Sequence, residues 1–167
     1  MITARIAFIG GGNMATSLLA GLLADGYEPQ LIRVAEPNPE RRSMLQARFG
    51  VQTLAGNQDA VTDAEILVLC VKPQLAATVC REIAAAVVAR KPLLVSVMAG
   101  IREQTIQRWL NAQIPVVRTM PNTPAMVQTG AIGLHASPEV DAEGRNRAET
   151  ILRAAGLVRW VDDEAKI

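Results

Sequence analysis

A short glycine-rich segment near the amino terminus has the residue types and spacing of a phosphate-binding turn. It reads G-x-G-x-x-A and directly follows an apolar run, Arg5–Ile9. Gly10 permits a tight turn, Gly12 lets the backbone approach a pyrophosphate, and Ala15 lets the next helix pack closely. The N–H groups at the start of that helix would face the diphosphate. The residues assigned to this dinucleotide-binding turn are Gly10, Gly11, Gly12, Asn13, Met14 and Ala15. A glycine-rich strand–helix turn that binds no ligand is the alternative.

An acidic residue follows the second apolar run at the distance expected for a ribose contact. Glu36 lies 24 positions after Gly12, close to the spacing of ~20 residues in dinucleotide-binding folds. Its carboxylate would accept hydrogen bonds from the ribose hydroxyls of NAD(H) and would repel the 2′-phosphate of NADP(H). Arg33, Arg41 and Arg42 would favour that phosphate, unless they simply form a solvated helix face. The residues alone leave the choice between the two cofactors open.

Composition argues against several other kinds of chemistry. His135 is the only histidine, so we expect neither a histidine-rich metal site nor a Ser-His-Asp hydrolase, and we assign His135 to structure. Cys70 and Cys80 form no CxxC pair, which favours reduced thiols in a cytoplasmic protein. The 17 basic and 16 acidic residues give no reason to expect a nucleic-acid footprint. No apolar run approaches the ~18 residues that cross a bilayer, and the run before Gly10 is too short for a signal peptide.

Apolar runs alternating with helical stretches must position the candidate residues, and 167 residues fit one domain. The expected strands are Arg5–Ile9, Leu31–Ala35, Val51–Thr53, Ile66–Cys70, Leu93–Val97, Pro115–Arg118, Ala131–His135 and Leu157–Val161. The expected helices are Asn13–Asp25, Pro39–Phe49, Leu75–Arg90, Arg102–Trp109 and Pro138–Ala155. Ile66–Cys70 is apolar at every position, which is typical of a strand covered on both faces. The pattern predicts an α/β fold with a doubly wound, mostly parallel sheet and helices on both faces.

Three further segments lie at the expected carboxyl ends of strands, where ligands of open α/β sheets bind. They are Cys70–Gln74 (CVKPQ), Ser96–Ile101 (SVMAGI) and Arg118–Pro124 (RTMPNTP). Together with the glycine turn they resemble the cofactor domain of pyrroline-5-carboxylate reductase, the last enzyme of proline biosynthesis. The resemblance runs from Ile6 to Glu164, and the MPNTP run is more specific than the glycine turn.

The resemblance implies a Rossmann-like NAD(P)-binding domain and adds further site residues. Those that would contact the cofactor are Asn57 on the adenosine side, Cys70, Val71, Lys72 and Pro73 beside it, and Val97, Met98 and Ala99 along the nicotinamide. Asn122 and Thr123 would shape the nicotinamide and substrate pocket, while no residue is assigned a certain catalytic role. The alternatives are structural: an N-cap for Asn57, a solvated strand end for Lys72, a buried strand end for Val97–Ala99 and a rigid turn for Pro121–Pro124.

The implied reaction is hydride transfer from NAD(P)H to C5 of 1-pyrroline-5-carboxylate, giving L-proline. The protonated imine accepts the hydride, so neither a nucleophile nor a metal is needed. The resemblance implies NADP(H) as the cofactor, and Glu36 makes NAD(H) possible. The expected partner is this small-molecule substrate, without nucleic acid or membrane.

Family members continue into a helical domain that forms homo-oligomers and carries Gly-Ser-Gly-Pro and Thr/Gly-rich substrate loops. Neither loop occurs in these 167 residues. We therefore expect residues 1–161 to be the NAD(P)-binding domain and 162–167 to begin a truncated connection, leaving turnover impaired. The alternatives are a catalytically silent NAD(P)-binding module and a related dehydrogenase, against which the MPNTP run argues.

Overall fold

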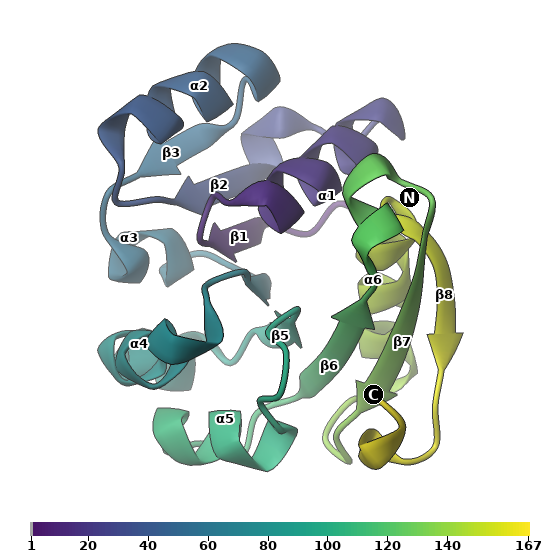
Figure 1. Ribbon diagram of the computed structural model, residues 1–167. Coiled ribbons are helices and arrows are strands. Elements are labelled where there is room, and N and C mark those ends of the chain that lie inside the picture. The colour runs from purple at the N-terminus through teal and green to yellow at the C-terminus, as the bar shows by residue number, and fades with distance from the viewer. Residues whose placement is uncertain (1) are drawn as a thin grey trace.

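The apolar runs form one sheet with helices on both of its faces (Figure 1). The structure is a computed structural model, and it describes residues 2–167. The strands are β1 (Ile6–Ile9), β2 (Ile32–Ala35), β3 (Gln52–Leu54), β4 (Ile66–Leu69), β5 (Leu93–Ser96), β6 (Val116–Pro121), β7 (Gly130–Ala136) and β8 (Gly156–Trp160). The α-helices are α1 (Asn13–Ala24), α2 (Pro39–Phe49), α3 (Asn57–Val61), α4 (Ala76–Arg90), α5 (Glu103–Leu110) and α6 (Ala142–Arg153). The 3₁₀ helices are η1 (Pro29–Leu31), η2 (Pro73–Leu75), η3 (Thr123–Val127) and η4 (Glu164–Lys166).

Alternate residues of the central strands pack on opposite faces of the sheet. Ile6 and Phe8 of β1 belong to the core that contains residues of α1, α2 and α6. Ala7 and Ile9 belong to a second core with residues of α3, α4 and α5. Because side chains alternate across a strand, a sheet buried on both faces needs apolar residues at every position. The prediction of a strand covered on both faces is confirmed.

The strand order is β3-β2-β1-β4-β5-β6-β7-β8, and the first six strands run parallel. The chain moves outward from β1 to β2 and β3, then returns to the other side of β1 with β4. This reversal creates a crevice beyond the carboxyl ends of β1 and β4, where ligands of doubly wound sheets bind. The mostly parallel fold predicted from the strand–helix alternation is confirmed.

The last two strands, β7 and β8, run opposite to the other six. β7 runs antiparallel to β6, and β8 runs parallel to β7. Residues 122–129 join β6 to β7, and a connection of this length is too short for the crossover that a parallel pair needs. β6 extends to Pro121, beyond the expected end at Arg118, because β7 pairs with it over Met120 and Pro121.

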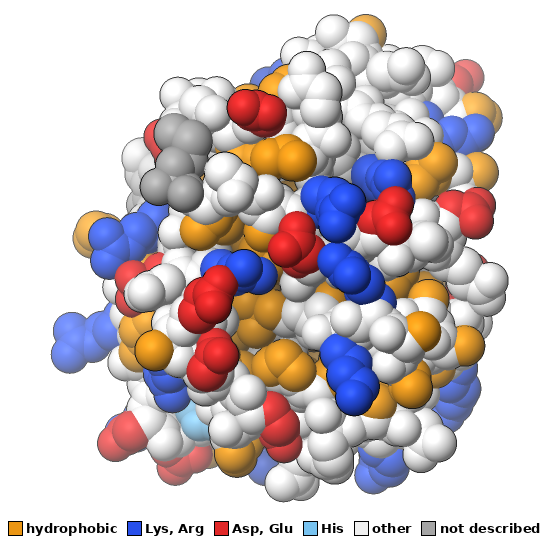
Figure 2. All heavy atoms as spheres, turned by 180° about the vertical axis from the view of Figure 1, so that it is seen from behind, with side chains coloured by type: hydrophobic (Ala, Val, Ile, Leu, Met, Phe, Trp, Pro, Cys, Tyr) orange, Lys and Arg blue, Asp and Glu red, His pale blue; other side chains and the backbone are white. Residues whose placement is uncertain are grey.

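Charged side chains of both signs are interspersed over the surface. On the face shown in Figure 2, basic and acidic side chains of the described residues lie side by side. This distribution agrees with the nearly balanced count of 17 basic and 16 acidic residues.

The last residues fold back onto the sheet through a polar contact. The Glu164 carboxylate accepts a hydrogen bond from the backbone N–H of Glu103 (2.8 Å) and pairs with the Arg118 guanidinium (3.3 Å). Ile167 lies against β7, where a Cβ on Gly133 would come within 2.5 Å of its Cγ2. The segment after β8 therefore has defined contacts with α5, β6 and β7.

Candidate functional site

The glycine turn joins β1 to α1 at the crevice between β1 and β4. Gly10 has φ +98°, and a Cβ there would lie 2.8 Å from the carbonyl oxygen of Cys70. Only glycine fits this backbone and this approach to the neighbouring strand end. Gly12 precedes α1 in extended conformation, and a Cβ there would meet no atom within 4 Å. The space in front of Gly12 therefore lies open at the turn.

The start of α1 is left open to an anion. Gly12 stands at the N-cap without a side chain, so no side chain accepts a hydrogen bond from the first N–H groups of α1. Such groups carry the positive end of the helix dipole and bind phosphate when they face a cleft. The geometry agrees with a cradle for a pyrophosphate.

Glu36 holds the glycine turn in place from the end of β2. Its Oε2 accepts a hydrogen bond from the backbone N–H of Gly11 (2.9 Å), and its Oε1 accepts one from Asn38 (3.0 Å). Only 9% of the residue is exposed. A Cβ on Gly11 would lie 2.7 Å from Leu45 Cδ1, so this position also has little space for a side chain. The carboxylate predicted to face a ribose is thus also part of the support for the turn.

The three arginines near Glu36 have different surroundings. Arg33 bonds Gln52 and Asp63 (3.2 Å to Asp63 Oδ2), whereas Arg42 donates to the backbone carbonyls of Glu36 and Pro37 (2.8 Å each). Arg41 donates to the carbonyl oxygen of Gly11 (3.2 Å) and lines the cleft.

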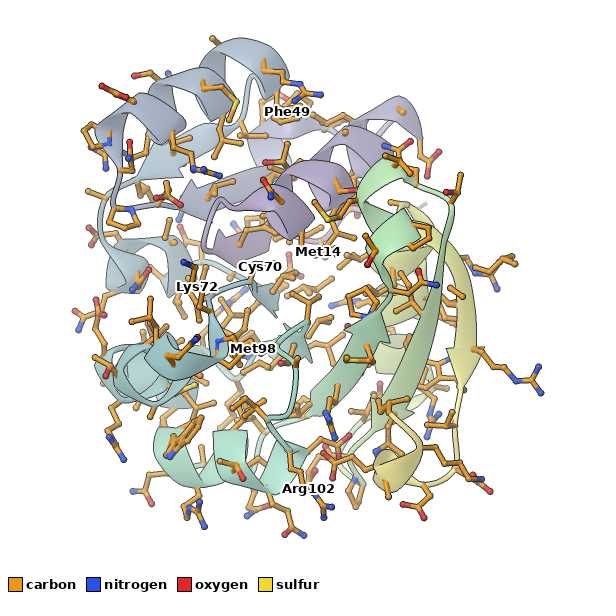
Figure 3. The ribbon with its side chains drawn as sticks, in the orientation of Figure 1. Met14, Phe49, Cys70, Lys72, Met98 and Arg102 are labelled. Carbon is orange, nitrogen blue, oxygen red and sulfur yellow. The ribbon has the colours of Figure 1, made fainter. Side chains whose placement is uncertain are left out.

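The opposite wall of the cleft comes from the end of β4 and the start of α4. Figure 3 shows Met14, Cys70, Lys72 and Met98 between α1 and the helices α4 and α5. Desolvation raises the pKa of the Cys70 thiol to about 12, so this cysteine is a neutral wall residue rather than a nucleophile. Pro73 begins η2, where its missing N–H costs nothing, as expected.

The cleft has a volume of about 460 Å³. It brings together many of the residues predicted from the sequence: Gly10, Gly11, Gly12, Asn13, Glu36, Asn57, Cys70, Val71 and Lys72. Its lining also includes residues that the sequence analysis did not assign to the site: Ala35, Pro37, Leu75 and Val79. Leu75 ends η2 and Val79 lies in the first turn of α4, four residues later, and this apolar spacing is the signal that could have indicated them.

Asn57 does not cap α3. Gly56 occupies the N-cap and Asn57 is the first helical residue, so the alternative of an N-cap is wrong. The Asn57 amide instead donates to Glu82 Oε2 (3.1 Å), and the residue lines the cleft.

The remaining predicted residues lie outside this lining. Met14 and Val97 are half-buried against one core, and Ala15 and Met98 are buried. Ala99, Asn122 and Thr123 are exposed. Because the Met98 side chain is only 2% exposed, we expect a cofactor to meet its backbone rather than its thioether. The Asn122 side chain accepts a hydrogen bond from the N–H of Ala131 (3.0 Å) and so bridges the ends of the β6–β7 connection.

A second hollow, of about 370 Å³, lies beside the start of α1 and was not predicted from the sequence. It lies between α1 and η3 and is lined by Asn13, Thr16, Ser17, Ala20, Arg48, Met126, Val127 and Gln128. The Ser17 hydroxyl donates to the Ala125 carbonyl oxygen (2.7 Å) and ties the two elements together. Asn13 lines both spaces, which makes the second hollow a neighbour of the cleft. In the sequence, the adjacent hydroxyl residues Thr16 and Ser17 in a largely apolar helix could have indicated this hollow.

Two other kinds of feature are absent from residues 2–167. Over residues 2–167, no group of three His, Cys, Asp or Glu side chains is placed to hold a metal ion. Within the same range, no helix has both the length and the apolarity required to cross a bilayer.

Comparison with known proteins identifies the family. A family model described as NADP oxidoreductase coenzyme F420-dependent matches residues 5–100. The chain belongs to this family. The matched range of this oxidoreductase family member contains the glycine turn, Glu36 and the Cys70–Gln74 segment, and ends before the MPNTP run.

Relatives that match nearly the whole chain extend the similarity to the strands after residue 100. The chain is 45% identical to pyrroline-5-carboxylate reductase of Pseudomonas aeruginosa, over 100% of this chain and 61% of the relative. The corresponding reductase of Vibrio alginolyticus is 39% identical, over 98% of this chain and 60% of the relative. The resemblance to these reductases is confirmed. The oxidoreductase chain spans about 60% of the length of the curated relatives it matches.

Solved structures agree with the fold. A pyrroline-5-carboxylate reductase from Coxiella burnetii superposes with a TM-score of 0.96 at 39% identity, over 99% of this chain and 61% of that one. The Plasmodium falciparum enzyme, solved with NADP bound, superposes with a TM-score of 0.85 at 20% identity. The match covers 99% of this chain and 60% of that one. At that identity the second likeness supports the fold alone.

Proposed function

We propose that this chain binds a nicotinamide adenine dinucleotide in the 460 Å³ cleft and forms the hydride-transfer half of a pyrroline-5-carboxylate reductase. The observation that carries the proposal is the open space at Gly12, a residue of the cleft lining where a Cβ would meet no protein atom within 4 Å. The 45% identity over the whole chain supports the choice of reaction.

The chain's own residues would hold the cofactor along the carboxyl ends of β1, β2, β4 and β5. The N–H groups of Gly12, Asn13 and the first turn of α1 would bind the pyrophosphate, because those of Gly10 and Gly11 already donate to the Ala35 carbonyl oxygen and to Glu36. Glu36 and Asn57 would bind the adenosine side, and Cys70–Pro73 would form the opposite wall. The cofactor itself, NADP(H) as the family description suggests or NAD(H) as Glu36 permits, supplies the hydride.

The later strands would orient the nicotinamide and the substrate. Val97, Met98 and Ala99 follow β5, where a buried Met98 side chain keeps the backbone fixed. Because Asn122 Oδ1 accepts the Ala131 N–H, the amide NH₂ of this exposed residue would serve as a donor to the substrate. Thr123 begins η3 beside it. These residues position reactants rather than exchange electrons.

The proposed substrate is 1-pyrroline-5-carboxylate, whose protonated C=N bond accepts the hydride at C5 to give L-proline. We assign residues 1–161 to the cofactor domain and 162–167 to a connection. We further propose that the whole protein forms homo-oligomers, as its resemblance implies. A cytoplasmic location is supported by the free thiols of Cys70 and Cys80.

A binding experiment tests the cofactor half of the proposal. NADH and NADPH are titrated into the chain while the fluorescence of the reduced nicotinamide is followed. We expect saturable binding that Gly12→Val abolishes, because branched carbons would fill the space of the pyrophosphate. The thermal midpoint of the variant without cofactor should match the original chain, since a Cβ at this position meets no neighbour within 4 Å. Undiminished binding by Gly12→Val would contradict the proposed site.

A chimera tests the reaction. The remaining part of the Pseudomonas aeruginosa reductase is joined after Ile167, and loss of NADH or NADPH absorbance is measured with 1-pyrroline-5-carboxylate. We expect turnover by the chimera and impaired turnover by the chain alone. A folded chimera that binds cofactor without reducing the imine would favour a catalytically silent binding module instead.

A further inference from the structure

Glu36 gives the proposed cofactor site a fixed negative charge at the end of β2. We propose that this chain binds NAD(H) in preference to NADP(H), because Glu36 stands where the adenosine ribose would lie and cannot move aside for a 2′-phosphate. The inference rests on the proposed function, since it concerns the adenosine end of the same cleft. It departs from the NADP in the family's description and follows from this chain's own residues.

Two backbone hydrogen bonds immobilise the carboxylate. One oxygen accepts the N–H of Gly11 at 2.9 Å and the other accepts the N–H of Asn38 at 3.0 Å. Rotation of Glu36 away from the cleft would leave both N–H groups without their acceptor. Each carboxylate oxygen can accept a second hydrogen bond. The ribose hydroxyls of NAD(H) can therefore bind a carboxylate that is already in position.

The nearby cations do not offset this charge for a phosphate. Arg33 is paired with Asp63, and Arg42 is held by the carbonyl oxygens of Glu36 and Pro37. Only Arg41 of the three lines the cleft, and it already donates to the Gly11 carbonyl oxygen. A single guanidinium would face both the Glu36 carboxylate and a phosphate of about two negative charges.

The other charged residues nearby do not change this balance. Lys72 lines the cleft from the β4 end, across from Glu36 and next to the proposed pyrophosphate site. Glu40 is exposed on the first turn of α2 and is not part of the cleft lining. Among the side chains that line the adenosine end of the cleft, Arg41 balances Glu36 when NAD(H) is bound, whereas a 2′-phosphate would add about two further negative charges beside the carboxylate.

Equilibrium binding measures the preference without catalysis. NADH and NADPH are titrated directly, and ADP and adenosine 2′,5′-bisphosphate are titrated as competitors that report on the adenosine end alone. We expect NADH to bind at least about tenfold more tightly than NADPH, and ADP more tightly than the bisphosphate, because like charges at close range are strongly unfavourable.

Three variants test whether Glu36 causes the preference for NADH. Glu36→Ser should reduce or invert the NADH preference, whereas Glu40→Ser, which removes the same charge from an exposed position of α2, should leave it unchanged. Adding Arg41→Gln to Glu36→Ser should weaken NADPH more than NADH, because Arg41 is then the group that meets the phosphate. Thermal midpoints without cofactor identify any variant that loses its fold.

The original chain alone decides the inference. Equal or tighter binding of NADPH would overturn it, even if Glu36→Ser failed to fold. An equal change in preference from Glu40→Ser and Glu36→Ser would also overturn it, because a diffuse field rather than the fixed carboxylate would then be responsible. Binding of neither NADH nor NADPH would overturn the proposed function itself.

Discussion

Gly10 and Gly12 belong to the same turn but are glycines for different physical reasons. Gly10 combines φ +98° with a strand neighbour that would lie 2.8 Å from any Cβ, so its requirement comes from the fold. Gly12 has an ordinary extended backbone and open space around it, so its requirement would come from a ligand. Gly10 is therefore required by the fold, whereas Gly12 is required by the proposed function.

The two glycines should separate stability from binding. We expect Gly10→Ala to lower the free energy of unfolding by about 1–3 kcal/mol, the cost of a disfavoured backbone conformation. Gly12→Ala should leave that free energy nearly unchanged and weaken dinucleotide binding. Urea unfolding and fluorescence titration measure the two quantities. Equal losses of stability in both variants would show that the turn has no open face at Gly12.

Residue types indicated much of the candidate site, but the sequence did not show their contacts. Glu36 was expected to face a ribose, yet its bonds to Gly11 and Asn38 depend on how β2 ends beside the turn. Asn57 left two roles open, and only the placement of Gly56 at the N-cap excludes one of them. Met98 is drawn into the core by packing that no local pattern specifies.

In helix α1, the sequence predicts which face is buried but not which other helix that face meets. Its apolar period predicts a helix with Leu18 and Leu22 toward the core, and both are buried. The period does not reveal that Gly21 lies against the end of α6. A Cβ on Gly21 would come within 2.2 Å of the Ala154 carbonyl oxygen. The glycine allows a close helix contact between segments far apart in the chain.

Replacing this glycine sets helix propensity against packing. Glycine to alanine inside a helix is normally stabilising by about 0.5–1 kcal/mol. We expect Gly21→Ala to be destabilising instead, by about 1–3 kcal/mol, because its methyl group meets a backbone carbonyl that cannot turn away. Gly144→Ala in α6 is a control, since its closest contacts are side-chain atoms of Val140 and Asp141. A higher urea midpoint for Gly21→Ala would contradict the proposed contact.

Two element boundaries differ from those predicted, one through a local cap and one through a partner strand. α6 begins at Ala142 rather than at Pro138, because the Asp141 side chain accepts the Gly144 N–H and caps the helix there. β6 is longer than expected because its end pairs with β7. Apolar period alone located the elements well, while their ends depended on a cap and on a partner strand.

On the scale of the whole molecule, a polar cluster joins four segments that are distant in sequence. Glu164 bonds the Glu103 N–H and Arg118, and Glu103 contacts His135 at 2.6 Å. Burial raises the pKa of Glu103, and the bond to His135 opposes that rise. In the described part of the chain, Arg118 Nε has no hydrogen-bond partner. The Arg118 side chain is 7% exposed, so Glu164 provides its main compensation.

Removing that compensation should destabilise the whole fold. We expect Glu164→Ala to lower the free energy of unfolding by about 3 kcal/mol, because it leaves a buried guanidinium unpaired. Lys166→Ala, which removes an exposed partner of Asp162 in the same segment, should leave the urea midpoint unchanged. Similar midpoints for the two variants would mean that the segment after β8 contributes no stability.

The sequence by itself determined the α/β alternation, the two-sided burial of the strands and the glycine turn, because each follows from local residue types and periods. It also contained the resemblance that leads to a reductase. Only the tertiary structure decided that β7 runs antiparallel, that Asn57 lines a cleft and that Glu36 is fixed by Gly11. These features depend on contacts between segments that no local pattern encodes, and the proposed NAD(H) preference depends on such contacts.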